Sequence, residues 1–267
     1  MLDVLSFDFM QNAIIAGLLV AIACGVMGSF VVVNRLSGVA GGIAHASYGG
    51  VGLACFLGFS PMLGSLGFAI LCALLMGFLT WRDRDRADTL IGVIWAVGMA
   101  LGVILTDLTP GYSGDMMSFL FGSILTVPTE LLYLMGGLLA VILVTVSVFF
   151  RRFLAISYDP EFSCVRGERV LLLYLLLITL IALTVVMAVQ AVGLILVIAL
   201  LTLPAFIAEA YAKGLVSMMV IASAISAILV VAGLFIAYSF NFVTGPVIIL
   251  LGALVYLVHL AVKKLSR

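Results

Sequence analysis

The sequence predicts an all-α fold, a polytopic bundle of transmembrane helices, and three observations lead to this class. Hydrophobic residues make up 66% of the 267 positions and charged residues only 9%, with a mean hydropathy of +1.42. Soluble domains are about one quarter charged, so most of this chain must be in contact with lipid. Long apolar runs recur along the chain, and the short connections between them carry nearly all of the charge.

A helix needs about 20 apolar residues to cross a bilayer, and about nine runs come close to that length, with eight as the alternative count. We find no extramembrane domain, low-complexity tract or internal repeat, so residues 1–267 are predicted to form a single transmembrane domain. The predicted spans are 9–33, 43–59, 62–81, 90–107, 129–150, 169–189, 192–212, 215–240 and 245–262.

The distribution of basic residues predicts the orientation, because Lys and Arg collect in cytoplasmic connections. With the N-terminus outside and the C-terminus in the cytoplasm, nine spans place all 12 basic residues on the cytoplasmic side. This agreement requires an odd number of spans. The N-terminal stretch MLDVLSFDFMQ has acidic residues where a signal peptide has basic ones, so we expect no cleavage.

Several classes of protein are excluded by composition and by missing motifs. A formal net charge of zero argues against a nucleic-acid-binding surface. The four cysteines lack CxxC spacing, which argues against a disulfide framework or a zinc knuckle. No HExxH, Ser/His or paired-aspartate constellation of an intramembrane enzyme is present, and the phosphate-binding pattern GxxxxGK[ST] is absent as well. We therefore predict that the chain does not hydrolyse ATP itself.

The predicted outer face is acidic where it carries charge, with Asp107, Asp115 and Glu130 near the ends of spans. Such carboxylates can raise the local concentration of cations, although solvated loop ends are the alternative interpretation. The turn-rich segment 109–127 is too short for a span. We expect it to include a half-helix folded back into the outer leaflet, with its backbone satisfied by protein or water.

The longest cytoplasmic connection, residues 151–169, contains the signals of a short helix. Asp159 can cap its N-terminus and Pro160 suits the first helical position. Glu161 complements the positive end of the helix dipole, and Gly167 offers a left-handed stop. The sequence therefore predicts a helix of about two turns within residues 158–168.

This short helix places Phe162 and Val165 three residues apart, on one face. A helix of two turns is poorly stable alone, which favours a role as a knob that fits a groove in a partner. The alternative is an interfacial helix lying on lipid headgroups, which its small apolar face makes less favourable.

The stretch GGIAHASYGG places His45 near the start of a predicted span. An ionisable group at membrane depth indicates a functional site, so His45 is a candidate ligand for a cargo passing through the protein. The alternative is a structural role, in which the imidazole N–H bonds a carbonyl one turn earlier. Both interpretations stay open at this stage.

Small residues and one proline are candidates for packing or gating. Gly49 and Gly50, and the GxxxG pair Gly98 and Gly102, allow helices to approach closely. Close approach near the histidine would narrow a translocation path. Pro204 removes a hydrogen bond inside the span 192–212 and is expected to kink it, which would suit either a hinge or the fit to a neighbour.

An ordered set of motifs along the whole chain resembles the membrane subunits of ATP-binding-cassette (ABC) importers for divalent metals. These motifs include the small-residue helix with its histidine, the coupling-helix sequence, and the helix with a mid-membrane proline. The segments are AGGIAHASYGGVGLA (40–54), ADTLIGVIWAVGMALGVIL (87–105), FLFGSILTV (119–127), YDPEFSCVRG (158–167), AVGLILVIALLTLPAFIA (191–208) and TGPVIILLGALVYL (244–257).

The resemblance implies a homodimer in a prokaryotic plasma (inner) membrane, with two cytoplasmic ATPase subunits and an extracytoplasmic metal-binding protein. The coupling helix from Asp159 to Gly167 would dock into the ATPase, whose closure would drive alternating access. No stably bound cofactor is implied, and a divalent metal would be the cargo.

One position departs from the family pattern. Family members commonly place an aspartate four residues before the histidine, and Gly41 stands there in this chain. Imidazole without a carboxylate suits zinc better than manganese, so we expect zinc first, then manganese or iron. The missing acid leaves open an importer of a metal chelate or corrinoid. A stand-alone secondary transporter or channel is a further alternative, although intramembrane carboxylates and inverted repeats are not evident.

Overall fold

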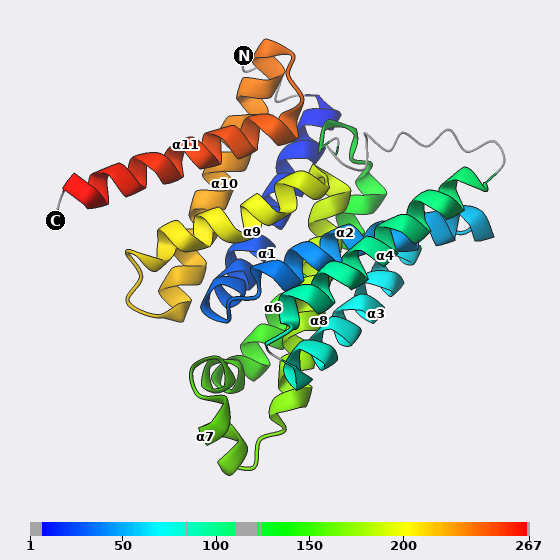
Figure 1. Ribbon diagram of the computed structural model, residues 1–267. Helices are drawn as coiled ribbons and strands as arrows, with labels where there is room; N and C mark the ends of the chain where they lie inside the picture. The colour runs from blue at the N-terminus through cyan, green and yellow to red at the C-terminus, as the bar shows by residue number, and fades with distance from the viewer. Residues whose placement is uncertain (1–6, 84, 110–121, 123, 266–267) are drawn as a thin grey trace. The chain divides into compact units, whose positions relative to one another are not determined.

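The computed structural model describes residues 7–83, 85–109, 122 and 124–265, and every regular element within them is helical, as predicted (Figure 1). The elements are α1 (Asp8–Val33), α2 (Ser37–Leu57), α3 (Pro61–Arg82), α4 (Ala87–Asp107), the 3-10 turn η2 (Ile124–Thr126), α6 (Thr129–Tyr158), α7 (Pro160–Val165), α8 (Val170–Val192), α9 (Leu194–Glu209), α10 (Leu215–Phe240) and α11 (Thr244–Leu265).

Each of the nine predicted spans corresponds to one helix, but one of them is shorter than predicted. Eight of the described helices are long and apolar enough to cross a membrane. The predicted span 192–212 becomes α9, which has only 16 residues. The prediction was wrong at both ends, because Gly193 interrupts the helix before Leu194 and the helix ends at Glu209, three residues before the predicted end.

Gly193 separates α8 from α9 with φ +81° and ψ 163°, a backbone conformation that is essentially restricted to glycine. Gly122, also at positive φ, packs directly on the backbone of Val192 and Gly193, where a Cβ atom would not fit. Pro204 lies inside α9 and is buried. Because proline has no N–H, α9 lacks one hydrogen bond of its ladder at this point.

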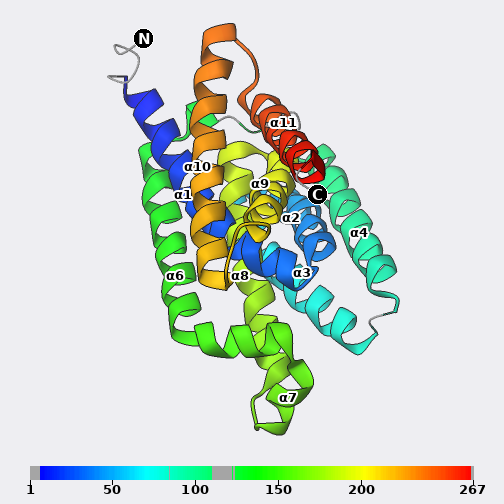
Figure 2. The ribbon, with the colours of Figure 1, turned by 90° about the vertical axis from the view of Figure 1, so that its left-hand side faces the viewer.

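The helices group into two compact units, each of which is described by itself. The first unit contains α1, η2, α9, α10, α11 and the start of α6, and within it α9, α10 and α11 pack against one another. The second unit contains α2, α3, α4, α7, the rest of α6 and most of α8. Within this second unit, α2 packs on both α3 and α4 (Figures 1 and 2).

Glycine allows α2 to approach its two neighbours at backbone distance. A Cβ atom on Gly49 would lie 2.7 Å from the carbonyl oxygen of Gly98 in α4, and one on Gly98 would lie 2.8 Å from the Cα of Ala46. Gly102 is similarly close to Tyr48, while Gly50 of α2 meets Gly64 of α3. The predicted packing role of these glycines therefore has a direct structural basis.

This close packing buries α2, which has the lowest mean hydropathy of the long helices. The central window of α2 has the lowest mean hydropathy of the eight span-length helices, yet it has the largest buried share, 72%. A helix that is covered by protein does not need an apolar surface toward lipid. The α2 helix can therefore carry polar side chains at membrane depth.

The described basic residues occupy alternate connections of the chain. They lie in the α1–α2, α3–α4, α6–α8 and α9–α10 connections or at the adjacent helix ends, and at the end of α11. We call these the basic ends of the helices. The assignment of the basic ends to the cytoplasm, and of the N-terminus to the outside, stays a prediction from the charge bias.

Replacing Gly98 with alanine is expected to destabilise the protein by about 1–3 kcal/mol, because the new methyl group meets the Ala46 backbone and side chain. Gly92, in the same helix, has open space around the corresponding position. Gly92→Ala should be neutral or stabilising by up to about 1 kcal/mol, since alanine favours helix. Thermal unfolding of both variants in detergent measures the difference, and equal midpoints would contradict it.

Candidate functional site

The short helix α7 begins at the predicted residue and with the predicted cap. The Asp159 carboxylate accepts a hydrogen bond from the Phe162 backbone N–H at 2.8 Å, and Pro160 occupies the first helical turn. Glu161 follows in the same turn, next to the positive end of the helix. Figure 2 shows α7 beyond the ends of α6 and α8.

The other end of α7 closes with a Schellman motif. Gly167 has φ +82°, and its N–H bonds the Cys164 carbonyl at 3.0 Å, while the Glu168 N–H bonds the Ser163 carbonyl at 3.1 Å. Ser163 is buried, and its hydroxyl donates to the Asp159 carbonyl at 2.8 Å. These bonds satisfy the ends of a helix that is only six residues long.

The outer face of α7 is apolar and exposed. Phe162 and Val165 are 55% and 87% exposed, and the Arg166 guanidinium lies 5.7 Å from the centre of the Phe162 ring. An apolar pair with a cation beside it, held on a helix with both ends capped, has the shape of a knob that can enter a groove. Leaving Phe162 and Val165 exposed to water is unfavourable, and a partner that covers them would remove this cost.

His45 lies about 12 Å along α2 from its basic end, which is close to the middle of this 21-residue helix. Its ring stacks on the Trp95 indole of α4, with centroids 4.5 Å apart and planes inclined by 21°. The His45 Nδ1 atom is buried and has no hydrogen-bond partner among the described residues. Nδ1 therefore makes no bond to a carbonyl one turn earlier, and the stacking on Trp95 is the contact that holds the ring.

In the described part of the chain, His45 does not belong to a cluster of metal ligands. Among the described residues, no group of three or more His, Cys, Asp or Glu side chains comes together. Asp107, at the end of α4, and Glu130, in the first turn of α6, are both exposed. Asp115 and most of the segment in which the half-helix was predicted lie outside the described residues. The described part of this segment includes the 3-10 turn η2.

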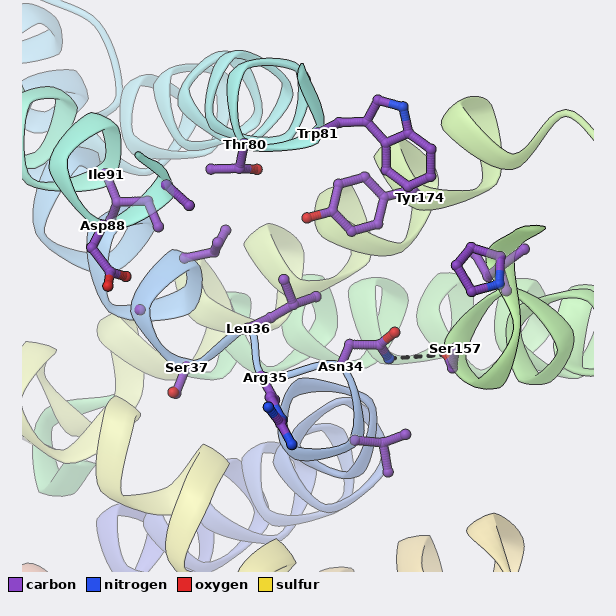
Figure 3. Close-up of a pocket in the computed structure, with 16 residues that line it drawn as sticks. Asn34, Arg35, Leu36, Ser37, Thr80, Trp81, Asp88, Ile91, Ser157 and Tyr174 are labelled. Atoms are coloured by element: carbon purple, nitrogen blue, oxygen red, sulfur yellow. Dashed lines mark hydrogen bonds between the residues drawn. The ribbon is translucent and has the colours of Figure 1, made fainter. Parts of the chain in front are cut away.

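A cavity of about 840 Å³ lies at the basic ends of the second unit (Figure 3). Its walls come from the start of α2, the end of α3, the start of α4, the end of α6, and residues of α7 and α8. In Figure 3 the Tyr174 hydroxyl points toward the open space, and the Trp81 ring lies beside it at 5.2 Å between centroids. The walls of this cavity thus include both Pro160 of α7 and Ser37 of α2.

One hydrogen bond crosses this region from the turn before α2 to the end of α6. The Asn34 side-chain amide donates to the Ser157 hydroxyl at 3.0 Å (Figure 3). The turn also contains Arg35 at φ +56°, a conformation that is uncommon for a residue with a Cβ atom. The tight turn orients the first residues of α2 toward the cavity.

Sequence reasoning missed Trp95 and the Asn34–Ser157 pair. Trp95 is eight residues into α4, as His45 is into α2, so parallel pairing of the two helices could have suggested their contact. No comparable signal links Asn34 with Ser157, which are 123 residues apart in the chain. Only the packed unit brings them together.

Comparisons with known proteins add to this geometry. The family described as the ABC 3 transport family matches residues 6–263. The chain belongs to the ABC 3 transport family. It is therefore a multi-pass plasma-membrane permease subunit without its own ATPase site, and ATP hydrolysis takes place in partner subunits. The resemblance noted from the sequence motifs is confirmed.

Three similar proteins match this chain over nearly its whole length. The membrane protein slr2045 of Synechocystis sp., described as uncharacterised, is 48% identical over 99% of this chain and 94% of its own length. The manganese import system permease protein ScaB of Streptococcus gordonii is 34% identical over 98% and 94%. The solved PsaBC of Streptococcus pneumoniae in complex with Fab is 35% identical, with a TM-score of 0.87 over 97% and 93%.

Removing the cap of α7 is expected to loosen this helix selectively. Asp159→Ala deletes the acceptor of the Phe162 N–H and should cost about 1 kcal/mol, which corresponds to roughly fivefold faster amide exchange in residues 160–166. Asp159→Asn retains a capping oxygen and serves as the matched control. Hydrogen exchange by mass spectrometry reads both variants, and unchanged protection in Asp159→Ala would contradict the capping role.

Proposed function

We propose that this chain is the permease of an ABC importer that carries a divalent transition metal into the cytoplasm. The observation that carries the proposal is its near full-length similarity to a permease named for manganese import, at 34% identity. The agreement in fold with PsaBC, at a TM-score of 0.87, supports the same class of transporter. An extracytoplasmic metal-binding protein would deliver the cargo to the acidic outer side, where Asp107 and Glu130 attract cations.

The energy for transport enters through α7. In this proposal the exposed pair Phe162 and Val165 docks into a groove of a cytoplasmic ATPase subunit, and closure of the two ATPases displaces α7. A lever of this kind has to be stiff, since a floppy helix would absorb the motion. The cap at Asp159 and the Schellman motif at Gly167 provide that stiffness.

The displacement of α7 has a short route to α2. Asp159 alone separates α6 from α7, and the Ser157 hydroxyl near the end of α6 is bonded to Asn34, three residues before α2. The cavity beside Pro160 and Ser37 leaves room for these elements to shift. We infer that α7 acts on α2 through this connection, and that α2 carries His45 with it.

His45 is the proposed contact with the metal in the membrane. Its Nδ1 atom is buried without a hydrogen-bond partner among the described residues, and a bound metal ion is one of the partners that would satisfy such an atom. One imidazole makes a weak metal site. A homodimer would contribute a second His45, which gives two nitrogen ligands on one path.

The glycine that replaces the family aspartate points to the softer metals. Gly41 is buried in α2, one turn before His45, at the position of the family aspartate. Imidazole ligands favour zinc over manganese, so zinc is the first candidate, followed by manganese or iron. A chelate or corrinoid importer is the second candidate, because a cargo with its own ligands would not need the missing acid. A metal-chelate type ABC transporter shares only the fold, at 17% identity and a TM-score of 0.76.

Changing Phe162 to Asp is expected to abolish co-purification of the ATPase with the permease, because a charge at the centre of the apolar knob would be buried on docking. Tyr211→Asp is the matched control, since Tyr211 is 62% exposed and lies in the connection after α9. Co-purification from cells expressing both chains measures the association, and the mass of the intact complex gives the number of permease copies.

A stand-alone carrier would predict a different result. If the wild-type chain transports without any ATPase, or if Phe162→Asp retains the partner as the control does, α7 is not the docking helix. A complex with one permease copy would overturn the homodimer.

Removing the imidazole of His45 is expected to reduce zinc uptake about tenfold or more, the usual effect of losing a metal contact. His259→Ala is the matched control, because His259 is the other histidine of the chain and lies near the end of α11. Uptake of radioactive zinc and manganese into proteoliposomes that contain the complete transporter provides the measurement. Gly41→Asp should shift the preference toward manganese, since a carboxylate is a harder ligand.

Two outcomes would contradict this assignment. Full zinc uptake by His45→Ala would remove the histidine from the pathway and would favour a cargo that arrives as a chelate. A parent protein that prefers manganese over zinc would show that Gly41 does not set the metal preference. Size-exclusion profiles identical to the parent exclude misfolding as the cause of either result.

A further inference from the structure

A second groove, separate from the cavity of Figure 3, lies between the basic ends of α6 and α8. It encloses about 450 Å³ and combines two arginines with leucine and phenylalanine side chains. Arg152 comes from α6, Arg169 directly precedes α8, and Phe149 and Leu172 form its apolar side. Gly167 and Glu168, which close the end of α7, also line the groove. The exposed pair Phe162 and Val165 and the contacts of His45 lie outside it.

The two helices place these arginines at the membrane boundary. Residues 131–150 of α6 carry no charged side chain, which is about the length that crosses the hydrocarbon core. Residues 170–192 of α8 are likewise uncharged. Arg152 and Arg169 therefore both lie where the apolar core ends and the phospholipid headgroups begin. Figure 2 shows α6 changing direction in this region, before it reaches α7.

The charges in the groove leave a net positive site. Glu168 forms an ion pair with Arg152, with the nitrogen and oxygen atoms 3.5 Å apart, and the Arg152 guanidinium also lies 5.8 Å from the centre of the Phe149 ring. Arg169 makes no ion pair with any carboxylate in the described part of the chain and is exposed. Its guanidinium is thus available to a phosphate, which arginine binds in a forked geometry.

The apolar side of the groove continues along the lipid-facing surface of the helices. Leu172 is 55% exposed, and Val144 and Val148, on the face of α6 that carries Arg152, are 63% and 71% exposed. A soluble partner would have to cover this apolar surface within the bilayer, whereas acyl chains cover it without cost. We propose that the groove binds the headgroup phosphate of an anionic phospholipid, with its acyl chains along Leu172 and Phe149.

Lipid binding to the full-length protein tests this proposal. The protein is purified in uncharged detergent, and native mass spectrometry measures retention of added phosphatidylglycerol and phosphatidylcholine. We expect phosphatidylglycerol to bind at least about tenfold more tightly, and Arg169→Gln to weaken it about fivefold. Arg82→Gln, a charge change at the basic end of α3 outside the groove, should leave binding unchanged.

Glu168→Gln provides a test of opposite sign. It removes the carboxylate that competes for Arg152, so phosphatidylglycerol should bind more tightly, by about threefold to fivefold. A loss of folding could not produce this gain. Tighter binding by Glu168→Gln together with weaker binding by Arg169→Gln supports the site.

Three results would overturn the proposal. Equal retention of the two lipids would show that the arginines do not select an anionic headgroup. Displacement of phosphatidylglycerol by millimolar inorganic phosphate would show a site for a free anion instead of a lipid. Loss of bound phosphatidylglycerol when the ATPase associates would show that a protein surface occupies the groove in the working complex.

Discussion

The close approach of α2 to α3 and α4 is the constraint on which the second unit of the structure depends. Gly49 and Gly98 have no side chains, so the backbones of α2 and α4 come into contact there. This contact covers α2, whose low mean hydropathy suits it poorly to contact with lipid. In a membrane, such packing contacts replace the hydrophobic effect as the force between helices. Because α2 is covered in this way, an imidazole can sit at membrane depth with its ring held against Trp95.

The same unit contains both the proposed input and the proposed output of the transport cycle. The capped helix α7 has an exposed apolar face for a partner, and α2 carries His45. The hydrogen bond from Asn34 to Ser157 and a cavity of about 840 Å³ lie in this region. Packed interiors transmit strain, while a cavity permits movement, so this arrangement suits a lever that pivots at one connection. Family membership places ATP hydrolysis in partner subunits, which such a lever requires.

Charge has two roles at the basic ends of the helices. The arginines predict the cytoplasmic side of the membrane through the positive-inside bias, and Arg152 and Arg169 also line one groove, at the proposed level of the headgroups. A lipid phosphate there would fix the ends of α6 and α8 next to α7. The stiffness of the lever would then depend on the bilayer as well as on the protein.

The sequence by itself determined the helical class, the presence of a helix at each of the nine predicted spans, and both ends of α7, because these depend on local composition and on residues a few positions apart. Asp159 and Gly167 act on their own backbone neighbours, so their roles could be predicted. The bounds of α9 could not, and the glycine that interrupts the helix before it, Gly193, packs on Gly122 from a distant part of the chain. Tertiary structure alone decided the stacking of Trp95 on His45, the Asn34–Ser157 bond and the groove at Arg169. Each of these joins segments distant in sequence, and apolar runs of nearly uniform composition carry little information about which helices become neighbours.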